Sequence, residues 1–405
     1  MHNFNNRVSS TKEIRNKLER NWIQFLNINS RELGKINFSG SSPPSVFVGH
    51  QGYPKILVGP MVPPIHGNTS ILDYPEKWIG KSIEEIANFR LSLVRGVYKT
   101  DIYSPFGKYI ESLQELAMAS TPAESEIVFE KTPIVTIEQK NFDTDSSPYG
   151  LVAPLKNFKI SSSISIDKRI ENTFYDKDLN STQSILKLYQ NGVEISKINR
   201  ILSMGMLGLK KKRKLVPTKW SISATDDIIS TNLIKKIENY PNLELYEVLR
   251  YHHLGNYYTI IFLPQNNWTF EMQEAWININ GNTVMGIDYE DNKKLNHNPS
   301  LAGAFFAARL AVLEYLDKIK KNAAAWVLRE IHPDYAIPVG VWQVREGIRK
   351  ASKENILKFE SFDKAYSYAC TLMSISKKEW LKNSKIYKNT IEQRKIQDYL
   401  NFNYN

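Results

Sequence analysis

The stretch Ala304-Phe-Phe-Ala-Ala-Arg-Leu-Ala-Val-Leu-Glu-Tyr-Leu-Asp-Lys-Ile319 carries the clearest helical pattern in the sequence. Its apolar residues recur at i, i+3, i+4 and i+7, the spacing of one wide apolar helix face. Asn256-Tyr-Tyr-Thr-Ile-Ile-Phe-Leu263 shows a strand pattern, because it has no charge and is rich in β-branched and aromatic residues. A long helix close to a strong strand predicts a mixed α+β fold.

Shorter patterns predict further elements before this region. Apolar residues at helical spacing indicate helices, and short β-branched runs between turn residues indicate strands. The predicted strands are Val46–Val48, Ile56–Val58 and Pro122–Glu130. The predicted helices are Thr11–Leu26, Ile83–Tyr98, Tyr109–Ala119, Asn180–Leu207 with a break near Gly192, and Leu233–Ile237.

These elements divide the chain into four predicted parts. Residues 1–35 form an N-terminal helical segment, and 36–287 form a larger mixed α/β part. Residues 288–389 form a mainly helical C-terminal part, and 390–405 form a flexible tail.

The overall charge indicates an acidic partner. The chain has 405 residues with 42% hydrophobic and 23% charged residues, which is a globular balance and not a disordered one. Its formal net charge is +11 and its pI is about 9.3. Nucleic acid is the first partner class that such an excess suggests, and an anionic membrane is the second.

The single cysteine, Cys370, limits the chemistry. One cysteine excludes an internal disulfide and a cysteine-based structural zinc site, and it suits a reducing compartment. We expect Cys370 to be a small buried apolar residue. The sequence has no signal-peptide pattern and no apolar run of about 20 residues, so we expect a soluble, cytoplasmic protein without membrane contact.

The stretch from Lys210 to Ser230 concentrates residues that suit nucleic acid. The predicted nucleic-acid-binding residues here are Lys210, Lys211, Lys212, Arg213, Lys214, Lys219 and Trp220. Cations attract phosphate, and an indole stacks on a base. The alternative is a solvated basic loop without a partner.

Two carboxylates follow in the same stretch. Asp226 and Asp227 are predicted catalytic residues together with Glu346, because carboxylates move protons and hold Mg²⁺ or Mn²⁺. The alternative is that Thr225-Asp-Asp caps the start of a helix.

Arginines in the C-terminal part offer a second anion site. Arg329, Arg345 and Arg349 are candidates to clamp a phosphate, with Glu330 or Glu346 as their partners. The alternative is that these are arginine–glutamate pairs that brace packed elements. His332 precedes Pro333, and we expect it to end a helix.

The last residues carry a short linear pattern. Gln393-Arg-Lys-Ile396-Gln-Asp-Tyr399-Leu400 places Ile396, Tyr399 and Leu400 on one side of a helical turn, with Gln393 at its edge. This pattern resembles the PCNA-interacting peptide (PIP motif), by which DNA repair and replication proteins attach to the sliding clamp. The alternative is an amphipathic last turn that folds back on the domain.

Several longer motifs resemble the archaeal DNA repair protein family Nre (NreA/NreB). They are Val46-Phe-Val-Gly-His-Gln-Gly-Tyr-Pro-Lys55, Ser104-Pro-Phe-Gly107, Ser112–Ser120, Val216–Ser230 and Pro338–Glu346, in this order. Many relatives begin with a four-cysteine zinc module, and this N-terminus has no cysteine. The resemblance therefore leaves the DNA-binding contribution of that module in doubt here.

The resemblance implies a DNA damage repair factor that binds PCNA through Gln393, Ile396, Tyr399 and Leu400. We expect a basic surface to contact DNA, with Arg345 as a further candidate. Two alternatives stay open. One is a metal-dependent nuclease, phosphodiesterase or glycosylase that acts on damaged DNA, and the other is a non-catalytic adaptor.

Overall fold

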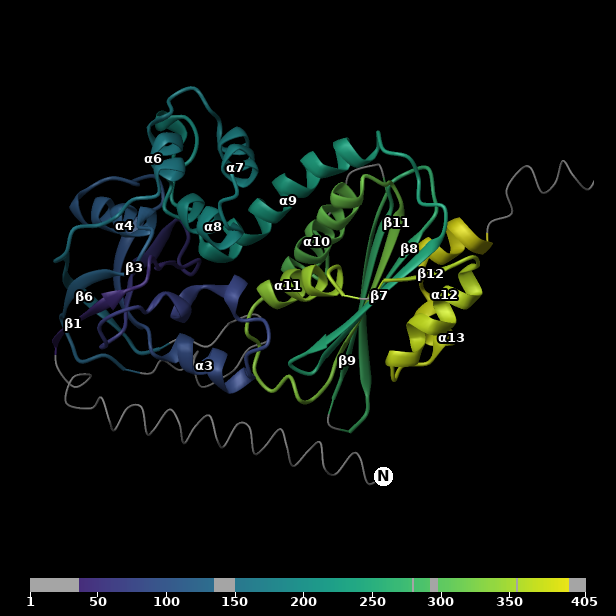
Figure 1. The fold of residues 1–405 in the computed structure, drawn as a ribbon. Coiled ribbons are helices and arrows are strands. Elements are labelled where there is room, and N and C mark those ends of the chain that lie inside the picture. The colour runs from purple at the N-terminus through teal and green to yellow at the C-terminus, as the bar shows by residue number, and fades with distance from the viewer. Residues whose placement is uncertain (1–35, 135–149, 279, 292–297, 355, 393–405) are drawn as a thin grey trace, which may run out of the picture. The chain divides into compact units, whose positions relative to one another are not determined.

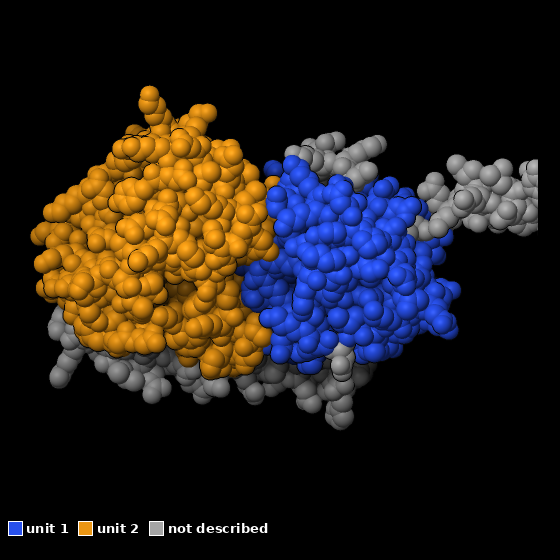
Figure 2. All heavy atoms as spheres, turned by 45° about the horizontal axis from the view of Figure 1, so that its top comes forward, with its two compact units in different colours: residues 1–9, 230–335, 344–405 blue, residues 10–229, 336–343 orange. Residues whose placement is uncertain are grey.

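The computed structural model describes residues 36–134, 150–278, 280–291, 298–354 and 356–392. These residues form two compact units, coloured separately in Figure 2. Unit 2 takes the described residues up to Ile229 together with Ala336–Gln343. Unit 1 takes Ser230–Tyr335 and the described residues from Val344 onward. Each unit has its own sheet, and the α+β prediction is confirmed.

The sheet of unit 2 has six strands in the order β1-β5-β6-β4-β3-β2. The strands are β1 (Asn37–Ser42), β2 (Val46–Val48), β3 (Lys55–Val62), β4 (Val94–Asp101), β5 (Ala123–Phe129) and β6 (Val152–Ile160). β4 and β6 are parallel, and the other pairs are antiparallel. The three predicted strands correspond to β2, β3 and β5, and β5 alternates buried and more exposed residues as its sequence indicates.

Helices complete unit 2 (Figure 1). They are α3 (Ile83–Leu91), α4 (Lys108–Met118), α6 (Lys168–Tyr175), α7 (Ser181–Gln190), α8 (Ile195–Ser203), the short turn η3 (Lys210–Lys212) and the first part of α9 (Thr218–Ile237). The predicted break near Gly192 is confirmed, because this glycine has φ +72° between α7 and α8.

The predicted helix Ile83–Tyr98 is wrong beyond its first half. α3 ends at Leu91, and β4 begins at Val94. Apolar residues of β4 happened to continue the helical spacing. Their real partners are distant in sequence, because β4 pairs with β3 on one side and β6 on the other.

The sheet of unit 1 also has six strands, in the order β10-β9-β11-β8-β7-β12. The strands are β7 (Tyr246–His253), β8 (Asn256–Leu263), β9 (Phe270–Ile277), β10 (Thr283–Glu290), β11 (Ala324–Ile331) and β12 (Leu357–Phe359). β11 lies between β8 and β9, antiparallel to the first and parallel to the second. The predicted part boundary near residue 287 falls within β10.

Helices cover both faces of this sheet (Figure 1). α10 (Gly303–Ile319) packs on one face, where Phe305 meets Phe270 and Tyr315 meets Phe262 at ring-centroid distances of 5.0 and 4.9 Å. The other face holds a core that includes Trp326. The helices on that face are α12 (Phe362–Ala369), α13 (Lys377–Lys382) and α14 (Lys385–Tyr387). Because both faces are covered, β8 and β11 read as nearly continuous apolar runs.

Three local predictions need correction. His332 does not end a helix, because it follows the buried strand β11. Thr225-Asp-Asp does not cap a helix either, since α9 already begins at Thr218 after Pro217. Leu233–Ile237 is the end of α9 and not a separate helix.

In the described part of the chain, no helix combines the length and the apolar character needed to cross a membrane.

Candidate nucleic-acid interface

The basic segment of unit 2 is built from the turn η3 and the residues that lead into α9. Lys210, Lys211, Lys212 and Lys214 are exposed, and so is Lys219 in the first turn of α9. Two backbone hydrogen bonds fix the end of this segment. The Leu215 N–H donates to the Ile102 carbonyl (2.9 Å), and the Val216 N–H donates to the Ser203 carbonyl (2.9 Å).

Arg213 differs from the lysines around it because its side chain turns inward. Its guanidinium donates to the carbonyls of Gly208 (2.8 Å) and Phe174 (2.6 Å) and lies 4.8 Å from the centre of the Phe174 ring. Burial lowers the pKa of this guanidinium from its ordinary value. Arg213 therefore anchors the segment to α6, and the exposed charge belongs to the lysines.

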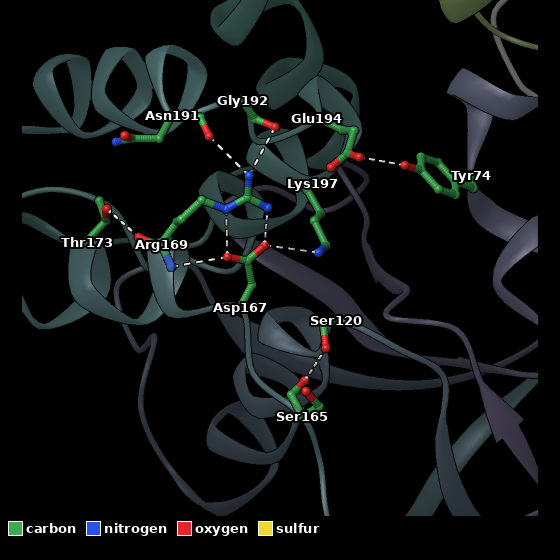
Figure 3. Close-up of polar contacts among 10 residues, drawn as sticks. All are labelled: Tyr74, Ser120, Ser165, Asp167, Arg169, Thr173, Asn191, Gly192, Glu194 and Lys197. Atoms are coloured by element: carbon green, nitrogen blue, oxygen red, sulfur yellow. Dashed lines mark hydrogen bonds and ion pairs between the residues drawn. The ribbon is translucent and has the colours of Figure 1, made fainter.

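A polar network connects α6 with α7 and α8 (Figure 3). Asp167 caps α6, and its carboxylate accepts hydrogen bonds from Arg169 Nε (2.9 Å) and Nη2 (2.7 Å). Arg169 Nη1 also donates to the carbonyls of Asn191 (3.1 Å) and Gly192 (3.2 Å) at the end of α7. Lys197 of α8 lies 3.4 Å from the Asp167 carboxylate. One arginine thus links α6 to α7, and one aspartate links α6 to α8.

The electrostatics of this network follow from the same contacts. The hydrogen bonds from Arg169, with the charge of Lys197, lower the pKa of Asp167 to about 2. Tyr74 donates a hydrogen bond from its hydroxyl to Glu194 (2.6 Å), and desolvation together with this bond raises the pKa of Tyr74. Asp167 is therefore ionised at neutral pH, and we assign the network a structural role.

Exposed aromatic side chains border the basic segment. Among the described residues, the large exposed hydrophobic side chains include five aromatic ones, and all five belong to unit 2. They are Tyr53, Tyr103, Phe106, Tyr175 and Trp220. Tyr53 and Trp220 contact each other with ring centroids 5.1 Å apart and an interplanar angle of 57°.

Hydrogen bonds place the loops of these aromatic residues beside the segment. The Ile102 N–H donates to the Pro54 carbonyl (3.1 Å), while the Ile102 carbonyl accepts from Leu215. The loop with Tyr103 and Phe106 therefore starts between the Tyr53 turn and the basic segment. Tyr175 follows Phe174, the ring under Arg213. Sequence reasoning found Trp220 but missed the other four, because they come from separate parts of the chain.

The predicted catalytic carboxylates are divided between the two units. Asp226 is fully buried in the middle of α9, and Asp227 follows it about 100° around the helix. Glu346 lies in unit 1 on α11 (Trp342–Ala351), and its Oε1 is 2.7 Å from Arg349 Nη1. Across the described residues, no group of three or more histidine, cysteine, aspartate or glutamate side chains could hold a metal ion.

The three candidate arginines of unit 1 are all paired with carboxylates. Arg329 is buried against Glu274 and also donates to the Asn256 side chain. Arg349 binds Glu314 through two hydrogen bonds of 2.6 and 2.7 Å. Arg345 has a side-chain exposure of only 2%, and its Nε lies 3.4 Å from Glu346. These contacts match the alternative in which arginine–glutamate pairs brace the fold.

Glu330 and Cys370 also lie inside unit 1. The Glu330 carboxylate accepts hydrogen bonds from the Ser374 and Ile375 N–H groups (3.0 and 2.7 Å) and lies 2.9 Å from His332 Nε2. Cys370 is buried as expected, and burial raises the pKa of its thiol. Neither residue reaches a surface.

A second polar cluster in unit 2 was not predicted from the sequence. Glu124 on β5 accepts a short hydrogen bond from Ser41 and lies 2.6 Å from His66 Nδ1. The hydrogen bonds from Ser41 and His66 hold the pKa of Glu124 below its ordinary value. Ser39 Oγ is 3.4 Å from His66 Nε2, which is long for a hydrogen bond. Since the Gly67 N–H donates to Ser41 (2.7 Å), this cluster fastens the segment after β3 to β1.

The predicted clamp-binding residues Gln393, Ile396, Tyr399 and Leu400 lie outside the described residues, as does the predicted helix Thr11–Leu26.

Fold and site together define an α+β protein with two six-stranded sheets and an exposed surface of lysines and aromatic rings. Two family models match this chain. "Archaeal Nre, N-terminal" covers residues 17–280, and "Archaeal Nre, C-terminal" covers residues 290–399. The chain belongs to the archaeal Nre family of DNA repair proteins, and the resemblance seen in its motifs is confirmed.

Similar proteins carry the same family name. The chain is 36% identical over 354 residues to "DNA repair protein NreB" of Archaeoglobus fulgidus. This alignment covers 86% of this chain and 88% of that protein. It is 34% identical to "DNA repair protein NreA" of the same organism, over 84% of this chain and 85% of that protein. It is 31% identical to "DNA repair protein NreA" of Haloferax volcanii, over 80% of each. No solved structure matches the chain.

Proposed function

We propose that this protein is a DNA repair factor that attaches to the sliding clamp PCNA through its C-terminal motif. In the same proposal, the basic segment of unit 2 contacts DNA. Family membership and the names of the relatives support a role in DNA repair. The cation-rich sequence, with a net charge of +11, supports an anionic partner.

The observation that carries the DNA contact is the exposure of the lysines. Five lysines within ten residues reach solvent, whereas Arg213 among them is folded inward. Exposed lysines attract the phosphate backbone without regard to sequence, and such binding weakens as salt rises. We leave Arg345 out of this surface because it is buried.

The tail supplies the second contact of the proposal. Ile396, Tyr399 and Leu400 would form a three-pronged apolar contact, with Gln393 hydrogen-bonded at its edge. Attachment to a ring around DNA raises the local concentration of a protein whose own DNA affinity is modest.

Calorimetry of the full chain with PCNA tests the attachment. We expect binding by the wild type and a loss of binding in the double variant Tyr399→Ala/Leu400→Ala, because its apolar anchors are removed. The double variant Asn401→Ala/Asn403→Ala changes the same tail outside the motif and should bind like the wild type. Equal affinity of all three proteins would remove the C-terminal motif from the proposed function, and absence of binding by the wild type would remove the clamp.

A DNA-binding measurement over a salt series separates the proposal from a non-catalytic adaptor. Salt-dependent binding supports a DNA-contacting factor, and absent or salt-independent binding supports the adaptor. No observation on the described residues favours the metal-dependent enzyme, and we do not propose it.

A further inference from the structure

We propose that Tyr53 and Trp220 form a binding site for unpaired bases of single-stranded DNA, with Lys214 and Lys219 beside it to bind phosphates. This inference rests on the proposed DNA contact and specifies which form of DNA the surface prefers. Proteins that bind single strands combine cations along the backbone with aromatic rings on which bases stack.

The two rings are held in place and open to solvent. Tyr53 and Trp220 are each 45% exposed, although they contact each other. Their interplanar angle of 57° means that the rings do not cover each other face to face. Trp220 sits in the first turn of α9, where Thr218 Oγ1 accepts a hydrogen bond from the Val48 N–H (3.2 Å) and ties this turn to β2. Tyr53 sits in the turn that is bonded through Pro54 to Ile102.

The distribution of exposed rings indicates a series of stacking positions, which we call the aromatic track, and not one isolated pair. Tyr175 follows Phe174, on whose ring Arg213 of the basic segment packs, and Trp220, in contact with Tyr53, follows Lys219. Tyr103, with an exposure of 67%, sits on the loop bonded to the segment at Leu215. Among the described residues, the large exposed aromatic side chains all belong to unit 2, as do the exposed lysines of the basic segment. Exposed apolar rings beside cations are typical of a nucleic-acid surface.

Close contacts of Gly205 hold the loop of Tyr103 and the basic segment together. Gly205 has φ +65°, and a Cβ atom there would lie 2.8 Å from the Lys214 carbonyl oxygen and 3.1 Å from Pro105. The Gln114 side chain also donates to the carbonyls of Pro105 (3.2 Å) and Met204 (3.0 Å). The loop that carries Tyr103 and Phe106 is therefore locked against the chain that leads to the lysines. Prepositioned rings reduce the entropy cost of stacking a base.

Stacking distinguishes the two forms of DNA. In a duplex the base faces are stacked on each other, and the protein reaches phosphates and groove edges. The lysines therefore bind both forms, but the aromatic rings bind only an unpaired base. We infer a preference for single-stranded DNA that resides in Tyr53 and Trp220.

Fluorescence anisotropy with the full chain tests this preference. The probes are labelled oligothymidine and a labelled duplex, both longer than the roughly 4–16 nucleotides that a single-strand module covers. We expect Tyr53→Ala and Trp220→Ala each to weaken binding to the single strand by about 5- to 150-fold, the loss expected for one stacked base. Duplex affinity should stay unchanged. Tyr53→Phe and Trp220→Phe keep a ring and should retain most of the preference.

Controls separate stacking from charge and from misfolding. Lys214→Ala and Lys219→Ala should weaken both probes alike, and Leu57→Ala, at an exposed site on neighbouring β3, should change neither. Circular dichroism melting confirms that the variants are folded. If the wild type binds DNA but the alanine variants keep the same ratio of single-strand to duplex affinity, the stacking site is overturned while the proposed DNA contact stands. If the wild type binds neither probe, the DNA contact itself fails and the stacking site falls with it.

Discussion

Two sets of cationic residues, one in each unit, are used in opposite ways. In unit 1 the arginines lie inside the fold, where Arg329 pairs with Glu274 and Arg309 pairs with Glu290. In unit 2 the lysines from Lys210 to Lys219 face solvent. In a buried ion pair the two opposite charges neutralise each other, so no net charge remains to attract a partner. These lysines, unlike the paired arginines, present their charge to solvent.

The largest expected effect breaks a buried pair of unit 1. We expect Arg329→Met to lower the free energy of unfolding by about 3–5 kcal/mol, because Glu274 would keep a buried charge without its partner. Urea unfolding measures the change. DNA affinity of the folded protein should not change.

The double variant Arg329→Met/Glu274→Leu is the matched control. An apolar pair of similar volume leaves no charge behind, so most of the missing stability should return. If the single variant costs less than about 1 kcal/mol, Arg329 is not a bracing residue and the contrast between the units weakens.

The next effect concerns binding and not stability. Replacing Lys210, Lys211, Lys212 and Lys214 together by alanine should lower DNA affinity and flatten its salt dependence. On duplex DNA, the slope of log affinity against log salt should fall by about 0.9 for each phosphate that the variant no longer neutralises. The free energy of unfolding should stay within about 0.5 kcal/mol, because these side chains are exposed. An unchanged salt slope would remove the segment from the interface.

The smallest effect is a pH dependence of the free energy of unfolding, which we expect from the Asp167 network of α6. The pKa of Asp167 is about 2 in the folded protein, below its ordinary value of 3.8. A depressed pKa contributes stability that is present above the unfolded pKa and is lost as pH falls through the folded pKa. The stability difference between wild type and Asp167→Asn should therefore be largest at neutral pH and shrink between about pH 4 and pH 2. Urea unfolding across this range measures it.

The substitution isolates the charge, because asparagine is also a good N-cap for α6. A constant difference between wild type and Asp167→Asn from pH 7 to pH 2 would show that the ion pairs of Asp167 do not stabilise the fold.

Local patterns predicted the elements that are decided locally. β8 occupies the residues predicted for it, and α10 begins one residue before its predicted start. Both are long and have an unambiguous period. The family was also predictable, since its motifs follow each other along the chain.

Contacts between distant residues explain what was missed. β4 is a strand because β3 and β6 flank it, which the spacing of Val94 and Val97 does not reveal. His332 follows a strand because β11 lies between β8 and β9. The aromatic track joins rings from positions 53, 103, 175 and 220, so only Trp220, next to the lysines, could be found from sequence.

The position of β11 has a consequence for dividing the chain. β11 belongs to the region matched by the C-terminal family model, yet it is hydrogen-bonded on both sides to β8 and β9 from the region matched by the N-terminal one. If the gene is divided between codons 280 and 290, the N-terminal fragment contains β8 and β9 without β11 between them. The C-terminal fragment contains β11 without either of these neighbours. Both fragments then have unpaired strand edges. Such edges promote aggregation. The two fragments should therefore be insoluble when produced separately and recover a folded complex only when produced in the same cell.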